Sequence, residues 1–218
     1  MKEGQISALQ TSALNNRAGR DSIIERRRIE AAENLWKAAI ELRAFKMAAM
    51  AFNSLNIEVV SKRAETDAKI REMIGIISGL DGVEIDPIVK SGADMQRLFL
   101  PVDAWATFNA IRSLLYYAYA RLKAIQGGIE DSEKLVDGVA VLDLVRIALP
   151  GYVPFIDQYG INGLGRLIEP LEELLFSQLQ NALNGEEADA QAVERSANLL
   201  RRAHQIQDGL AEVAAQQN

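Results

Sequence analysis

The chain has 218 residues, of which 49% are hydrophobic and 25% charged, and its formal net charge is -6. This composition excludes general disorder, and the length is sufficient for a hydrophobic core. The sequence has no cysteine and one histidine, His204, so disulfides, thiolate metal sites and metal centres built on several histidines are excluded.

Helix is the favoured secondary structure, because alanine is abundant, proline is scarce and no stretch alternates between apolar and polar residues with period two. We therefore expect an all-α fold of six to eight helices, with a long N-terminal helix or helical hairpin packed on a helical bundle. Residues 1–80 would form the long helix or hairpin and serve as an oligomerisation segment. Residues 81–218 would form the bundle domain.

The first elements in chain order are a short helix and a long one. Residues 3–16 are compatible with a short helix that ends near Gly19, and equally with a frayed terminus or the tail of a longer coiled coil. Ser22 and Glu25 then have the spacing of a capping box, which predicts the start of a second helix that runs to Leu55. Asn53, Ser54 and Asn56 can cap a new helix, which favours a break near Asn56 that folds the chain into a hairpin. The alternative is an unbroken rod of about 85 Å, because the apolar pattern continues through Val60, Ala64, Ala68, Ile74 and Ile77.

The long helix has two apolar faces. One comprises Ile24, Ala31, Leu35, Ala38, Leu42, Phe45, Ala49 and Phe52. The other comprises Ile29, Ala32, Trp36, Ile40, Met47 and Met50. Two faces suggest partners on more than one side, so we predict an oligomer interface at Trp36, Ile40, Met47 and Met50. The alternative is that the Met and Phe residues of 44–52 belong to the core, which is the commoner role of such a stripe.

Turn residues divide the rest of the chain. Gly79 ends the helix before it, and a helix over 102–126 follows Pro101. We expect the remaining elements to be a helix capped by Asp131 or Ser132 that ends at Leu149, an irregular region over 152–166, a helix from Pro170 to Asn184 and a final helix from about Glu187 to Asp208.

The helix over 102–126 carries the most distinctive surface. Its core face is predicted to comprise Ala104, Phe108, Ile111, Leu115, Ala118, Leu122 and Ile125. The adjoining face mixes aromatic rings, an amide and cations, which suits a ligand or a protein partner: Trp105, Asn109, Arg112, Tyr116, Tyr119 and Lys123. The alternative is structural, with Arg112 paired to a carboxylate and the tyrosines covering the core.

The remaining motifs give weaker evidence of a functional site. The glycine-rich run 160–165 before Arg166 could present backbone N–H groups to an anion, but its spacing matches neither phosphate-binding fingerprint, so we interpret it as a structural turn. The acidic loop at 81–86 lacks the ligand ladder of a calcium site. We predict no metal and no cofactor. We do not expect nucleic-acid binding, because Arg26, Arg27 and Arg28 do not form one stripe and the chain is acidic.

Short motifs resemble a group of uncharacterised bacterial helical proteins. They are Glu33-x-Leu-Trp36 in a long helix and the later Trp105-x-x-Phe108-x-x-x-Arg112. The resemblance implies a context near phage-defence or mobile-element genes. We expect a soluble, cytoplasmic protein without a membrane span, because no 18-residue apolar run is present.

Two functions are compatible with these observations. One is a non-enzymatic interaction or scaffolding module that binds a protein partner or forms a homo-oligomer, and it could serve as an accessory component of a bacterial defence or regulatory system. The alternative is a small-molecule or nucleotide sensor that uses the aromatic and cationic face of 102–126, with Arg166 as a candidate contact for an anion. The length of the opening helix, its two apolar faces and the lack of a catalytic motif favour the first. An enzyme stays open, since carboxylates and tyrosines can be catalytic.

Overall fold

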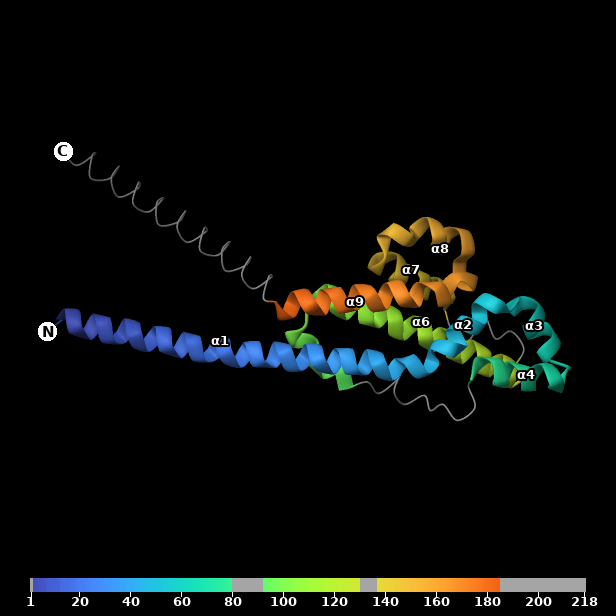
Figure 1. The fold of residues 1–218 in the computed structure, drawn as a ribbon, viewed down its shortest axis with the longest axis horizontal. Coiled ribbons are helices and arrows are strands. Elements are labelled where there is room, and N and C mark those ends of the chain that lie inside the picture. The colour runs from blue at the N-terminus through green and yellow to red at the C-terminus, as the bar shows by residue number, and fades with distance from the viewer. Residues whose placement is uncertain (1, 80–91, 130–136, 185–218) are drawn as a thin grey trace. The chain divides into compact units, whose positions relative to one another are not determined.

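The computed structural model describes residues 2–79, 92–129 and 137–184, and within residues 2–18 the backbone alone. In these ranges the regular structure is helical and includes no strand, which confirms the all-α fold class (Figure 1). The α-helices (α) and 3-10 helices (η) are α1 Lys2–Glu41, η1 Leu42–Phe45, α2 Lys46–Ser54, α3 Ile57–Ala64, α4 Ala68–Ser78, η2 Gly92–Phe99, α6 Val102–Gln126, α7 Gly138–Ala148, η4 Pro150–Tyr152, α8 Val153–Tyr159, η5 Gly160–Leu167 and α9 Ile168–Leu183.

Residues 1–179 form one compact unit, and residues 180–218 form a second. The predicted boundary between residues 80 and 81 lies outside the described residues, so that division stays a prediction. The acidic loop at 81–86, the predicted final helix over 187–208 and His204 also lie outside them.

α1 is one continuous helix of 40 residues, about 60 Å long at 1.5 Å per residue. The predicted helix end near Gly19 and the predicted start at Ser22 are therefore wrong. A glycine within a helix is about 1 kcal/mol less favourable than alanine, which long flanks of good helix formers outweigh. The capping-box pattern at Ser22 and Glu25 thus lies inside a helix that had already begun.

The predicted break near Asn56 is confirmed. Leu55 has an extended backbone with ψ of 138°, and the Asn56 side chain accepts a hydrogen bond of 3.2 Å from the Val59 N–H. This bond satisfies one of the free N–H groups at the start of α3. A second bend follows, because Asp67 caps α4 in the same way.

α6 lies at the centre of the first unit and has the predicted bounds. It packs against α2, α4 and α7 and also contacts α1, η1 and α3 (green in Figure 1). The predicted core face is confirmed, because each of its seven residues is buried: Ala104, Phe108, Ile111, Leu115, Ala118, Leu122 and Ile125.

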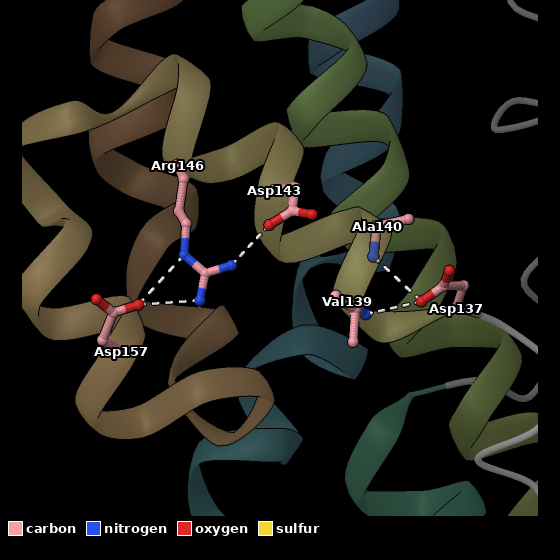
Figure 2. A network of polar contacts seen from close by, with 6 residues as sticks. All are labelled: Asp137, Val139, Ala140, Asp143, Arg146 and Asp157. Carbon is pink, nitrogen blue, oxygen red and sulfur yellow. Dashed lines mark hydrogen bonds and ion pairs between the residues drawn. The ribbon is translucent and has the colours of Figure 1, made fainter.

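The region from α7 to η5 differs from the prediction in two respects. Asp137 caps α7 by accepting hydrogen bonds from the Val139 and Ala140 N–H groups at 2.9 and 3.1 Å (Figure 2). The predicted caps at 131 and 132 lie outside the described residues. The stretch predicted to be irregular, 152–166, is mostly helical as α8 and η5. Pro154 is compatible with α8 because it lies near the helix start, where no N–H bond is lost.

Arg146 links α7 to α8. Its guanidinium donates to Asp157 Oδ1 from Nη2 at 2.9 Å and from Nε at 3.2 Å, and to Asp143 Oδ1 at 2.7 Å (Figure 2). The hydrogen bonds to Asp157, and then those to Asp143, raise the pKa of Arg146 above its ordinary value. The cation therefore holds two carboxylates from neighbouring helices.

Within the described residues, no single helix combines the length and the apolar character that crossing a membrane requires. Gly138–Ala148 and Pro150–Leu183 together reach that length and composition, but the chain bends by 117° between them. Length and composition alone make this bent pair weak evidence for a membrane span, because core helices of soluble proteins meet the same criteria.

Candidate functional site

The fold covers one of the two apolar faces of the run from α1 to α2. The covered face is buried from Ala31 onward, where α1 reaches the core. Ile24, which was predicted to belong to this face, is 45% exposed because it precedes the part of α1 that meets the core. The buried residues of the run are Ala31, Ala32, Leu35, Ala38, Ala39, Leu42, Phe45, Ala48, Ala49, Ala51 and Phe52.

The other face is largely uncovered, but Ala32, which was predicted to belong to it, is 3% exposed and packs in the core. Ile40, Met47 and Met50 are 45%, 55% and 48% exposed, and Ile29 is 40% exposed. Trp36 is half-buried. We call these five residues the α1–α2 surface. It contains the four residues predicted as an oligomer interface, and their role as an interface stays a prediction.

Trp36 lies at the boundary between the covered and the uncovered face. Its ring packs against Phe176 of α9, with ring centroids 5.3 Å apart, and the Arg43 guanidinium lies 5.8 Å from the Trp36 ring centroid. Phe176 is itself 45% exposed. Part of the tryptophan therefore stabilises the fold, while its exposed edge continues the apolar α1–α2 surface.

Two cations beside this boundary are bound by Glu172 of α9. Arg43 Nε lies 3.3 Å from Glu172 Oε1, and Lys46 Nζ lies 3.2 Å from Glu172 Oε2. The sequence suggested a helix-dipole role for Glu172 and gave no sign of these ion pairs, because the partners are more than a hundred residues apart. They fix α9 against η1 and the start of α2.

Three of the six residues predicted as a site on α6 contribute to one polar and aromatic cluster. Asn109 Nδ2 donates to the Trp105 carbonyl at 3.1 Å, and Arg112 Nη2 donates to Asn109 Oδ1 at 2.7 Å. Arg112 also pairs with Asp94 of η2 at 3.4 Å. Its guanidinium lies 6.0 Å from the Trp105 ring centroid, as does that of Arg97. We call these five residues the Trp105 cluster.

Most of the cluster is engaged internally. Trp105 is only 9% exposed, and Arg112 also lies 5.7 Å from the Phe108 ring centroid. The structural alternative, in which Arg112 pairs with a carboxylate on a packed helix, describes this geometry. The ligand or partner role of the cluster stays a prediction.

The remaining predicted residues are Tyr116, Tyr119, Lys123 and Arg166. Tyr119 packs edge-on against Phe45, with ring centroids 5.4 Å apart, and Lys123 donates to Gln126. Tyr116 is 36% exposed. Arg166 is an exposed residue of η5, and no hydrogen bond or ion pair with another described residue involves it.

An exposed apolar group beside the Trp105 cluster was not predicted from the sequence. Met95, Leu98 and Val102 are 80%, 88% and 86% exposed at η2 and the first residue of α6. Their spacing of three and four residues is a usable signal, but without the structure it would predict a buried face. We call these three residues the η2 surface.

The glycine-rich run serves packing. An added Cβ at Gly165 would lie 2.6 Å from the Ala49 carbonyl oxygen, so the absence of a side chain lets η5 approach α2 closely. A Cβ at Gly163 would lie 2.8 Å from the Phe155 ring. Among the described residues, no three acidic or histidine side chains gather closely enough to hold a metal ion.

Comparisons with protein-family models, with curated proteins and with solved structures gave no match. The geometry of the described residues therefore carries the functional argument. It offers two exposed apolar surfaces, and one aromatic and cationic cluster in which Arg112 is already paired with Asp94.

Proposed function

We propose that this chain is a protein-interaction or scaffolding module that binds its partner through the α1–α2 surface. The observation that supports this proposal is the exposure of Ile40, Met47 and Met50 on a run whose other face is buried from Ala31 onward. Exposed apolar patches mark interaction sites in soluble proteins, because leaving such side chains in water is unfavourable. Two methionines also suit a contact surface, since the thioether side chain adapts to differently shaped partners.

The η2 surface supports a scaffolding role. Its three apolar residues are more exposed than those of the α1–α2 surface. They lie on η2 and α6, whereas the α1–α2 surface lies on α1 and α2. A module with two separate apolar surfaces can hold two partners at once. Within this proposal the chain is a non-enzymatic accessory component of a bacterial defence or regulatory system, a context taken from the resemblance in the Glu33 to Trp36 and Trp105 to Arg112 motifs.

The second candidate function is a small-molecule or nucleotide sensor at the Trp105 cluster. The pairing of Arg112 with Asp94 gives it less support, because an anionic ligand would have to displace that carboxylate. A thermal-shift screen with nucleotides tests it. A ligand at about 100 times its dissociation constant would add about 2.7 kcal/mol of stability, and Arg112→Ala would abolish the shift.

Site-specific cross-linking tests the interaction module. A photoreactive amino acid is placed at position 40 or 50, and the chain is irradiated both purified and in an extract of cells that produce it. We expect a covalent product with a protein at both positions. Ile40→Asp should remove the product formed from position 50, because a buried, unpaired carboxylate would oppose binding.

The matched control positions are Glu58 and Lys69, which are exposed residues of α3 and α4. A photoreactive group at either position should give no specific product. If positions 40 and 50 gave the same products as the two controls in both samples, the α1–α2 surface would not be a binding surface and the proposal would fail.

A further inference from the structure

Six residues along α1 lie on one stripe of the helix, and three of them are apolar. They recur at alternating intervals of four and three residues, which is the spacing of a coiled-coil seam. Five are exposed, and Trp36 is half-buried. The six residues are Ser22, Arg26, Ile29, Glu33, Trp36 and Ile40.

Between Gly19 and Glu30, α1 contributes no residue to the hydrophobic core. No residue from Gly19 to Glu30 is buried, and Ile23 and Ile24 are 66% and 45% exposed. Over about three turns, therefore, this helix contributes no fully buried side chain to its own unit. Most of the stability of protein helices comes from packing, so such a segment gains stability from a partner.

Charge reverses along the seam at Ile29. Arg26 precedes Ile29 by three residues, and Glu33 follows it by four. Both side chains are exposed, and no ion pair among the described residues involves either of them, because the nearby pairs are Arg27 with Glu30 and Arg28 with Glu25. The surrounding charges follow the same trend, with a basic excess over 20–28 and an acidic excess over 29–41.

This reversal selects one orientation for two copies of α1. A parallel pair in register would place Arg26 beside Arg26 and Glu33 beside Glu33, and like charges at close range are unfavourable. An antiparallel pair centred near Ile29 would place each Arg26 beside the Glu33 of the second copy. Two-fold symmetry gives two such Arg26–Glu33 contacts in each pair.

We infer that the partner of the seam is a second copy of this chain, bound antiparallel along α1. This inference rests on the proposed function, because it names the occupant of the α1 part of the α1–α2 surface, which comprises Ile29, Trp36 and Ile40. The pair covers Ile29 and brings Trp36 and Ile40 against residues 19–23 of the second copy, where Gly19 and Ser22 leave room. The overlap of residues 19–40 is about 33 Å long.

Sedimentation equilibrium of the full chain tests the inference. Between about 1 and about 100 µM, the average mass should rise from one chain toward two. Arg26→Glu and Glu33→Arg should each weaken association at least about tenfold, since each turns two attractive contacts into repulsive ones. An equal mixture of the two variants should dimerise again. Lys69→Glu is the control, because it makes the same charge change as Arg26→Glu at an exposed position of α4. It should leave association unchanged.

Orientation is tested by disulfide trapping, because the chain has no cysteine of its own. In a mixture of Ser22→Cys and Lys37→Cys chains, the antiparallel pair should join positions 22 and 37. A parallel pair would instead join like positions, and that result would overturn the orientation.

A wild-type chain that sediments as a single chain at every concentration would overturn the inference as a whole, as would a charge-swapped mixture that fails to dimerise. The proposed function is judged separately. A product from position 40 or 50 with a different protein, in extract alone, would retain the interaction module and reject the second copy as its partner.

Discussion

The two apolar faces of the run from α1 to α2 have similar sequence patterns and different surroundings. Leu35, Leu42 and Phe45 are at most 1% exposed, whereas Ile40, Met47 and Met50 are about half exposed. The first face meets α6 and other core elements, and the second meets solvent. Apolar periodicity therefore shows that a face needs a partner, and it does not show whether the same unit supplies that partner.

Replacing Phe45 by alanine should have the largest effect, because this ring is buried and packs edge-on against Tyr119. Loss of a buried phenylalanine costs about 3–5 kcal/mol in lost burial and cavity formation. Urea denaturation at a concentration where the chain is monomeric measures the free energy of unfolding. Met47→Ala on the uncovered face should change it by less than about 0.5 kcal/mol.

The comparison would break if Met47→Ala destabilised the monomer as strongly as Phe45→Ala. That result would mean that the α1–α2 surface is part of the core. The interface prediction at Met47 would then be wrong.

Gly165→Ala tests how the covered face is held. The added Cβ would lie 2.6 Å from both the Ala49 carbonyl oxygen and Asn53 Nδ2, and the backbone of α2 does not yield easily. We expect a loss of about 1–3 kcal/mol, typical of overpacking, measured by the same denaturation. Gly151→Ala is the matched control, because nothing lies within 4 Å of its added Cβ. A neutral result at Gly165 would show that η5 can move away from α2.

The sequence predicted those features that depend on local residues. The bounds of α6 and the break at Asn56 follow from turn residues and helix caps, and the α6 core stripe follows from its period. Local signals failed where the surrounding chain outweighed them, as when the helix continued through Gly19 and Ser22. Contacts between distant segments left no local trace, as with Glu172 and its two cations or Arg112 and Asp94.

Asn56→Ala tests the bend that ends the apolar run. The side chain accepts from the Val59 N–H, and loss of such a cap costs about 1 kcal/mol. Asn56→Asp should retain most of the stability, since a carboxylate caps equally well. Equal losses for the two variants, measured by thermal and urea denaturation, would show that the cap does not stabilise the bend.

Glu172→Gln should have the smallest effect, and it acts at the boundary between the covered and uncovered faces. The substitution removes the charge that Arg43 and Lys46 share, but these cations are 49% and 33% exposed, so solvent screens the interaction. We expect a loss of about 0.5–1 kcal/mol that shrinks in about 1 M salt, where the Debye length is about 3 Å. Glu173→Gln is the control, because Glu173 is exposed and no ion pair among the described residues involves it. If the loss of stability at Glu172 did not respond to salt, Glu172 would act by packing beside Trp36. Side-chain packing, and not ion pairing, would then stabilise the boundary.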